Sequence, residues 1–394
     1  MTLSSINPLS AEAVDEFLAQ YWQKKPLLIR QALPDITSPL TADELAGLAC
    51  EEDVNARLVI EHVDHAADEK PWSVEYGPFD ESRFASLPES HWSLLVSDVE
   101  RHVEEAAALL QRFRFIPDWR LDDLMISYAP LGGSVGPHTD AYDVFLLQLQ
   151  GQRQWSINCD FDQAQLENTE LSILKTFTAE QQWILDAGDM LYLPPNVAHH
   201  GIARSGNAEG CMTASIGFRA PTVNAMIQGF SDRLANHIDD TLMYADPELK
   251  SQIHSAEITS GAIDKIKQLL QEQYLINTEN VQRWIGEFSS EPKVSAPEFA
   301  GKQLSSFEVF CKAIQNNCLQ QSSESSFLFS RTRQGALLFV DGKSYPMSVD
   351  LAETLCQHSI DIAKLINNTD VCMQQVMLDL YHQGALVIPE SKND

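Results

Sequence analysis

The sequence is poor in basic side chains and has no cysteine arrangement typical of disulfide-rich or zinc-ribbon proteins. Lys and Arg total 27 against 56 Asp and Glu, which gives a formal net charge of −29. Because affinity for a phosphate backbone comes largely from Lys and Arg, this balance argues against nucleic acid as a partner and favours a basic protein. The seven cysteines are odd in number and form no CxxC pair, which predicts reduced thiols in a cytoplasm.

Long apolar runs are also missing. No stretch reaches the roughly 18 consecutive apolar residues that a membrane span needs, and no basic segment with an apolar core follows Met1. We therefore expect a cytoplasmic protein with no membrane contact. The chain has 394 residues, of which 44% are apolar, so it is long enough for two or three domains with cores of their own.

The first part of the chain combines helical and strand patterns. Helices are predicted over residues 10–22, 41–48 and 99–113, and a strand over residues 27–30. From Leu124 the pattern changes to short apolar runs separated by Gly, Pro, Asn and Asp, at 124–128, 142–150, 154–157, 183–186, 190–193 and 212–218. Closely spaced strands of this kind predict an α+β catalytic domain over residues 1–221, built on a double-stranded β-helix, which is a jelly-roll or cupin-like barrel.

The second part is mainly helical. Residues 223–238, 263–274 and 279–288 predict a helical region over 222–290, and the Ser- and Pro-rich stretch 289–297 predicts a linker. Residues 300–394 combine helices with a hairpin at 327–329 and 336–340 and a turn at Asp341-Gly342, a mixture that resembles a winged helix. Residues 301–394 hold fewer basic than acidic side chains. We therefore expect this module to contact protein rather than DNA.

Two histidines and a carboxylate have the order and chemistry of a non-haem iron site. His138-Thr139-Asp140 follows a Gly-rich segment, 132–137, that permits close backbone approach. On a strand, residues two apart face the same side, so His138 and Asp140 are expected to point together and Thr139 away. A third ligand is expected from the segment 186–201. Two imidazoles and one carboxylate leave three positions of an octahedral Fe(II) open, which favours iron over zinc and an oxygenase over a binding protein.

Two further predictions concern the third metal ligand and the residues that bind a co-substrate. His199 and His200 are neighbours, so on an extended strand only one of them can face the metal, and the residues alone leave both open. A dicarboxylate co-substrate that chelates the iron at one end needs a cation for its far carboxylate. Arg153, on the strand after the run 142–151, is the candidate, and Ser127 is a candidate hydroxyl donor.

Several motifs together resemble the JmjC-type ribosomal oxygenases of bacteria. The motifs are Tyr21 to Pro26, Ile29 to Gln31, Asp122 to Tyr128, Gly136 to Asp140, Tyr142 to Phe145, Gly151 to Trp155, Gly188 to Pro195 and Ser215 to Pro221. The resemblance spans nearly the whole catalytic part, and the helical region with its winged-helix-like tail agrees with the architecture of that family.

This resemblance implies an Fe(II)- and 2-oxoglutarate-dependent dioxygenase that hydroxylates an arginine side chain of the large-subunit ribosomal protein numbered sixteen. It implies His138, Asp140 and His199 as iron ligands, because the family pattern of Pro-Pro, three residues, His, one residue and Gly fits His199. It assigns Arg153 and Ser127 to 2-oxoglutarate. Eukaryotic relatives use Lys at the position of Arg153 and act on histidine. The family's helical segment also implies a homodimer through residues 223–288.

The sequence departs from the family pattern at Asn196-Val197-Ala198 and at His200, close to the third ligand. Tyr142 and Asp143 are candidates for holding the substrate guanidinium. Two alternatives share the same ligands: another JmjC protein hydroxylase or demethylase, and a non-enzymatic metal-sensing cupin with a DNA-binding winged helix.

Overall fold

The protein is described from a computed structural model, which covers residues 6–63, 71–167, 169–204, 210–219, 221–274, 276–293, 304–315, 319–357, 360–367 and 371–388. The chain divides into two compact units, Met1–Ala220 and Pro221–Asp394, each of which is described by itself. The three-domain division at 221 and 290–300 stays a prediction.

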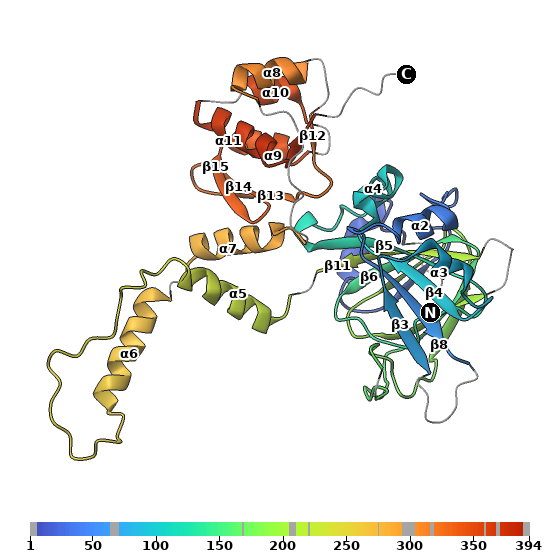
Figure 1. The fold of residues 1–394 in the computed structure, drawn as a ribbon, viewed down its shortest axis with the longest axis horizontal. Coiled ribbons are helices and arrows are strands. Elements are labelled where there is room, and N and C mark those ends of the chain that lie inside the picture. The colour runs from blue at the N-terminus through green and yellow to red at the C-terminus, as the bar shows by residue number, and fades with distance from the viewer. Residues whose placement is uncertain are drawn as a thin grey trace. The chain divides into compact units, whose positions relative to one another are not determined.

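The first unit is built on two antiparallel sheets (Figure 1). The larger has eight strands in the order β1-β9-β6-β11-β5-β4-β2-β3, and the smaller has three in the order β10-β7-β8. Their bounds are β1 Leu27–Ile29, β2 Ala56–Glu61, β3 Trp72–Tyr76, β4 Trp92–Val96, β5 Leu121–Ala129, β6 Asp143–Gln150, β7 Gln152–Asn158, β8 Gln181–Leu185, β9 Met190–Leu193, β10 Ala198–Arg204 and β11 Cys211–Phe218.

Short helices accompany these sheets. They are η1 Ala11–Ala13, α1 Val14–Gln20, α2 Ala42–Leu48, α3 Glu81–Ala85, η2 Val99–Arg101, α4 Glu104–Gln111 and η3 Asp118–Arg120. Helix α2 begins with a capping box, in which the Thr41 side chain accepts from the Glu44 backbone and the Glu44 carboxylate accepts from the Thr41 backbone. The single helix predicted over 99–113 is wrong, because Val103 adopts an extended conformation and separates η2 from α4.

Both faces of the large sheet are covered at strand β6. Seven of its eight residues, Asp143 to Leu149, are buried. Phe145 and Leu147 belong to the core that also contains residues of the helices, whereas Val144 and Leu146 pack with Trp155 and other residues of the small sheet. A continuous apolar run of this kind is typical of a strand with both faces covered. The inner face of the large sheet therefore meets the small sheet.

The six predicted strand segments between Leu124 and Phe218 are all present as β5 to β9 and β11. Strands β2, β3, β4 and β10 were not predicted. Strand β3 has one buried residue in five, so its sequence carries little of the apolar alternation expected of a strand. The fold is a mixed α+β one, as predicted.

The second unit combines helices with small sheets (Figure 1). The helices are α5 Val223–Ala235, α6 Ser260–Gln273, α7 Thr278–Ser290, α8 Phe307–Gln315, α9 Val349–Leu355, α10 Ile362–Asn367 and α11 Val371–His382. The strands are β12 Gln320–Gln321, β13 Phe327–Arg331, β14 Ala336–Val340, β15 Lys343–Met347 and β16 Leu386–Val387. The turn at Asp341-Gly342 joins β14 to β15, with positive φ angles of 48° and 77°.

Helix α7 packs on the sheet formed by β13, β14 and β15. The Ser344 hydroxyl donates to the Glu287 carboxylate at 2.7 Å, and Gly286 lies so close to the Phe339 ring that a side chain there would overlap it. Ser289 and Ser290 of the predicted linker belong to α7, and residues 294–297 lie outside the described residues. The predicted helical region and the C-terminal module therefore share contacts. The winged-helix assignment stays a prediction. Among the described helices, none has both the length and the apolar character to cross a membrane.

Candidate functional site

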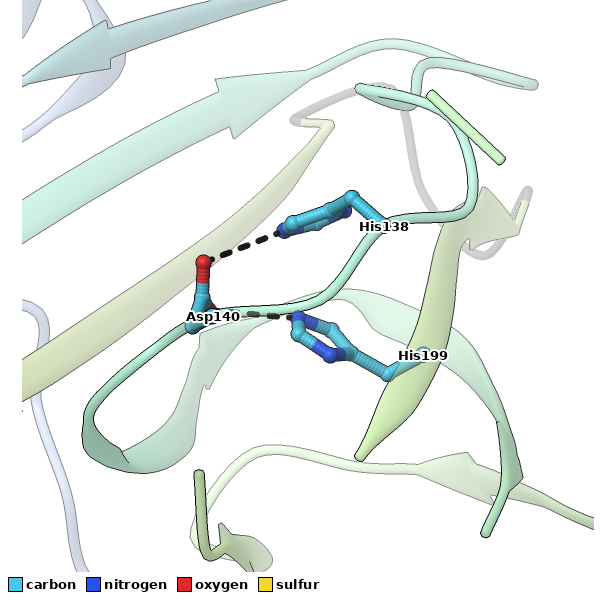
Figure 2. Close-up of side chains that lie close together, drawn as sticks. All are labelled: His138, Asp140 and His199. Atoms are coloured by element: carbon cyan, nitrogen blue, oxygen red, sulfur yellow. Dashed lines mark ion pairs between the residues drawn. The ribbon is translucent and has the colours of Figure 1, made fainter. Parts of the chain in front are cut away.

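His138, Asp140 and His199 meet inside the first unit. A β-bridge joins the backbones of His138 and His199, and it sets their ring centroids 4.2 Å apart. The Nε2 atoms of His138 and His199 lie 3.8 Å and 3.5 Å from the two carboxylate oxygens of Asp140 (Figure 2). One possible ligand atom from each of these three residues lies within 4.8 Å of the other two.

The backbone fixes the tautomer of each ring. Nδ1 of His138 lies 3.0 Å from the Gly136 carbonyl oxygen, and Nδ1 of His199 lies 3.0 Å from the Val197 carbonyl oxygen. Because a carbonyl only accepts, Nδ1 carries a proton in both rings, so Nε2 is the nitrogen through which the neutral form of each ring can bind a metal. Burial, followed by the neighbouring His138, lowers the pKa of His199 to about 4. A neutral imidazole with a free Nε2 is the form that binds a metal.

The segment carrying the first two ligands is not a regular strand. His138 makes a bridge, but Thr139 and Asp140 are irregular, and Thr139 lines the cavity instead of pointing away from it. The prediction for Thr139 is therefore wrong. The backbone of Asp140 is held by Asn196, whose N–H donates to the Asp140 carbonyl oxygen at 2.8 Å. The backbone thus connects Asp140 to the segment that leads into His199.

His200 faces away from the cluster. Its Nε2 lies 3.0 Å from the Ser134 hydroxyl, and its ring packs edge-on against Phe177. Strand β10 alternates its side chains, so His199 and His200 project to opposite faces. The structure brings His199, and not His200, to His138 and Asp140.

A cavity of about 340 Å³ contains this cluster and is lined by residues of both sheets. Arg153 of β7 and Ser127 of β5 both line it and are 4% and 5% exposed. The Nη2 atom of Arg153 is buried with no hydrogen-bond partner among the described residues, whereas Nε contacts Cys211 Sγ at 3.5 Å. A buried guanidinium with a free donor fits a carboxylate ligand. Ser127 donates a long hydrogen bond, 3.4 Å, to the Thr213 carbonyl.

A second hollow adjoins the cavity and is acidic. Asp122 and Asp123 line it, and Tyr142, Arg57 and Tyr76 line both spaces. Burial, followed by the nearby Asp140 carboxylate, raises the pKa of Tyr142 far above its usual range, so its hydroxyl keeps its proton. The hollow thus places two carboxylates and two aromatic rings beside the histidine cluster, together with Arg57, and the Asp122 carboxylate is already paired with Arg219 at 3.4 Å.

Asp143 does not reach this hollow, so the prediction that it contacts substrate is wrong. Its side chain is fully buried. It accepts hydrogen bonds from Tyr192 Oη at 2.6 Å and from Gln23 Nε2 at 2.9 Å, and it lies 3.5 Å from Arg120 Nη2. Asp143 directly follows Tyr142. Because neighbouring residues of an extended chain face opposite sides, the Asp143 side chain points into the core.

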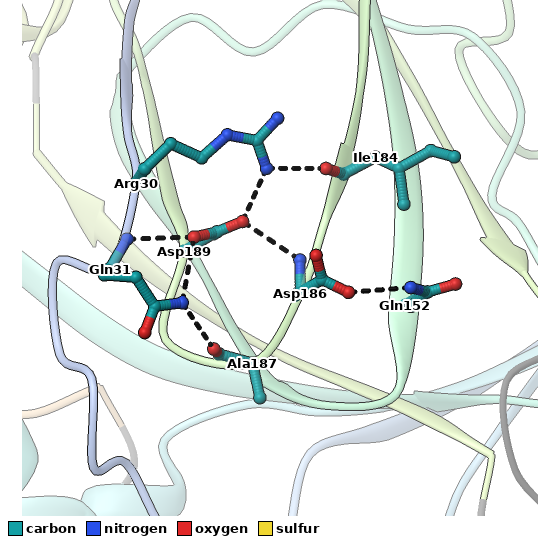
Figure 3. A network of polar contacts seen from close by, with 7 residues as sticks. All are labelled: Arg30, Gln31, Gln152, Ile184, Asp186, Ala187 and Asp189. Carbon is teal, nitrogen blue, oxygen red and sulfur yellow. Dashed lines mark hydrogen bonds and ion pairs between the residues drawn. The ribbon is translucent and has the colours of Figure 1, made fainter. Parts of the chain in front are cut away.

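The Gly188-Asp189 motif has a structural role. Asp189 is 2% exposed and accepts from Arg30 Nη1 at 2.6 Å, from the Gln31 backbone at 2.9 Å and from the Asp186 backbone at 3.1 Å (Figure 3). Gly188 has a φ of +88°, and a side chain there would meet the Leu33 carbonyl. This network connects the end of β1 to the turn before β9. Strand β9 is followed by β10, which carries His199.

Sequence reasoning missed Trp155 and Thr213 of the cavity and Asp122 and Asp123 of the adjoining hollow. Period-two alternation could have found some of them, because Asp123, Met125 and Ser127 follow one another on one face of β5, as Arg153 and Trp155 do on β7. Thr213 lies on β11, whose pairing with both β5 and β6 is a long-range property of the fold.

Comparisons with known proteins agree with this architecture. The model of the JmjC domain family matches residues 108–226. The chain is 39% identical over 280 residues to a protein of Escherichia coli K12 called ribosomal protein uL16 3-hydroxylase, covering 71% of each chain. It is 38% identical over 265 residues to a probable ribosomal oxygenase of Haemophilus influenzae, covering 64% of this chain and 62% of the relative.

Solved structures give the same result. The E. coli protein YcfD superposes with a TM-score of 0.79 at 30% identity, covering 95% of this chain and 98% of YcfD. A structure of YcfD, described as a ribosomal oxygenase in complex with cobalt and 2-oxoglutarate, gives a TM-score of 0.77 at 29% identity, covering 96% and 98%. The fold, the cavity and these relatives lead to one conclusion: the chain belongs to the JmjC-domain family of ribosomal oxygenases.

Proposed function

We propose that this protein is an Fe(II)- and 2-oxoglutarate-dependent dioxygenase that hydroxylates an arginine side chain of the large-subunit ribosomal protein uL16. The observation that carries the proposal is the sharing of one cavity by two features. These are the His138, Asp140 and His199 cluster and the Nη2 donor of the buried Arg153, which has no partner among the described residues. The first fits a metal and the second fits a dicarboxylate.

The site residues have separate tasks. His138, Asp140 and His199 hold the metal through Nε2 and carboxylate oxygens, and Arg153 with Ser127 binds the far carboxylate of the co-substrate. Bound iron would supply the activation of O2. In the overall reaction 2-oxoglutarate loses CO2 and takes up one oxygen atom to become succinate, while the other oxygen atom is inserted into a C–H bond of the substrate. Apolar cavity residues such as Leu95, Val144 and Leu146 exclude water around these groups.

The acidic hollow supports arginine as the modified residue. A guanidinium placed between Asp122, Asp123 and the ring of Tyr142 directs its aliphatic stem toward the histidine cluster, because the two spaces share Tyr142, Tyr76 and Arg57. The net charge of −29 attracts a basic ribosomal protein, and the E. coli relative is named for its action on uL16. Such a substrate fits a cytoplasmic enzyme.

The test is incubation of the protein with Fe(II), 2-oxoglutarate and purified uL16. We expect tandem mass spectrometry to locate one added oxygen on an arginine, and succinate to form in equal amount. Asp140→Ala is the inactive control. Oxygen on a histidine, or loss of a methyl group from lysine, would replace the arginine assignment with one of the alternatives. Tight binding of duplex DNA at physiological salt, with no succinate from any peptide, would contradict an enzymatic role altogether.

We also infer a homodimer through the helical region. Helix α6 exposes Ile263, Ile266 and Leu270 at helical spacing, with 54%, 45% and 63% of each residue accessible, and α5 exposes Ile227. An apolar face of this kind is typical of a surface that a partner covers. Sedimentation should give the mass of two chains, and Ile266→Asp with Leu270→Asp should give one. A monomeric wild-type protein at micromolar concentration would disprove the dimer.

A further inference from the structure

Trp155 has a buried polar atom that nothing in the described structure satisfies. Its side chain is 5% exposed, and its indole Nε1 has no hydrogen-bond partner among the described residues. A buried indole N–H normally has an acceptor, because leaving it unpaired is costly. Trp155 lines the same cavity as the histidine cluster, as does Arg153, whose Nη2 is in the same condition. Two residues that line one cavity thus each carry a buried donor with no partner among the described residues.

The surroundings fix the orientation of the indole. Trp155 pairs with Gly201 across β7 and β10, and a Cβ added to Gly201 would lie only 2.6 Å from ring carbons Cη2 and Cζ3. The benzene edge of the indole therefore packs on the Gly201 backbone. Since Nε1 lies on the opposite part of the ring system, the N–H is turned away from Gly201.

The ring is close to both places where a co-substrate would be held. Its centroid is 5.8 Å from the centroid of His199, and the guanidinium carbon of Arg153 lies 5.7 Å from it. A small dicarboxylate that reaches from the metal ligands to Arg153 therefore passes beside the indole. Its carboxylate oxygens are strong acceptors.

We propose that the indole N–H of Trp155 donates a hydrogen bond to a carboxylate oxygen of 2-oxoglutarate and is a second co-substrate donor beside Arg153. The inference rests on the proposed function, because it takes 2-oxoglutarate as the ligand of this cavity. A cation–π contact with Arg153 does not by itself explain the residue, since a phenylalanine ring makes that contact without burying an N–H.

The first test is binding of 2-oxoglutarate to the full chain loaded with Zn(II), measured by calorimetry, so that no turnover is needed. Trp155→Phe keeps an aromatic ring and removes the donor, together with part of the indole volume that packs on Gly201. We expect its Kd for 2-oxoglutarate to rise about tenfold or more, as for a lost hydrogen bond to a charged group, with unchanged Zn(II) affinity. Trp183→Phe is the matched control, because Trp183 pairs with Trp155 on β8 but does not line the cavity.

The second test is observation of the indole N–H itself. In protein labelled with ¹⁵N-tryptophan, the signal that Trp155→Phe removes should move downfield when 2-oxoglutarate is added to the Zn(II)-loaded wild type. Equal Kd values for wild type and Trp155→Phe, or an indole signal that stays in place while 2-oxoglutarate binds, would overturn the inference. A wild-type protein that binds no 2-oxoglutarate would instead overturn the proposed function.

Discussion

The backbones of His138 and His199 donate hydrogen bonds to each other, at 3.0 Å from His138 N and at 2.9 Å from His199 N. This bridge brings together two side chains that are distant in the sequence. Each ring then donates Nδ1–H to a carbonyl two residues before it, from Gly136 and Val197. The geometry of the candidate metal site is therefore set by the main chain, before any metal is bound.

Replacing Asp140 or His138 should greatly weaken metal binding. Asp140→Ala or His138→Ala leaves two ligands, and we expect Co(II) affinity to fall by more than about 100-fold, measured by equilibrium dialysis. His200→Asn is the matched control, since His200 contacts Ser134 and Phe177 outside the cluster. If His200→Asn lost the metal and His138→Ala kept it, the site assignment would be wrong.

Arg153 should determine the affinity for 2-oxoglutarate. Arg153→Met removes a buried, partly unpaired guanidinium, and we expect the Kd for 2-oxoglutarate to rise by about 10- to 100-fold, as for lost charge-assisted hydrogen bonds. Arg153→Lys should recover only part of this affinity, because one ammonium cannot reproduce the planar fork. Arg204→Gln, an exposed change on neighbouring β10, should bind 2-oxoglutarate normally. An unaltered Kd for Arg153→Met would place the co-substrate elsewhere.

Replacing Asp143 should mainly lower the stability of the protein, whereas replacing Asp123 should mainly weaken the use of substrate. Asp143→Asn disturbs the buried contacts with Tyr192, Gln23 and Arg120, and we expect it to lower the free energy of unfolding by about 1–3 kcal/mol. Its KM for uL16 should stay close to that of wild type. Asp123→Asn should raise this KM several-fold with little change in stability. Denaturant unfolding and steady-state kinetics measure the two effects, and a reversed pattern would restore Asp143 as a substrate contact.

Glu100 should make the first unit less stable as the pH rises. Burial raises the pKa of Glu100 to about 7 from its ordinary value of 4.5, although its carboxylate accepts a hydrogen bond from the Leu124 N–H. The folded state therefore holds this proton more tightly than the unfolded state. The cost of ionising Glu100 is absent below pH 4.5, grows between pH 4.5 and 7, and is complete above pH 7.

The test is Glu100→Gln, whose stability relative to wild type should increase by on the order of 2–3 kcal/mol between pH 5 and 8. Tryptophan fluorescence is a suitable probe, because every tryptophan except Trp284 lies in residues 1–220. Glu105→Gln, on the exposed face of α4, is the control and should change little. A constant difference between Glu100→Gln and wild type across this pH range would contradict the raised pKa.

The sequence revealed the candidate site better than its surroundings. Short apolar runs predicted seven of the eleven strands of the first unit, namely β1, β5 to β9 and β11. The chemistry of His138, Asp140 and Arg153 identified the cavity. Thr139 was misplaced because the rule of alternation assumes a regular strand, and the chain is irregular there. The burial of Asp143 depends on Tyr192 and Gln23, which come from distant segments. Such contacts cannot be derived from local periodicity.

The network around Asp189 limits how far the catalytic unit can be shortened. Arg30 and Gln31 supply donors to a nearly inaccessible carboxylate, and β1 occupies one edge of the eight-stranded sheet beside β9. A protein that began after Gln31 would leave that negative charge buried with fewer partners and would expose β9 as a new edge open to intermolecular pairing. The residues up to Gln31 therefore stabilise the first unit, and we expect a protein without them to aggregate.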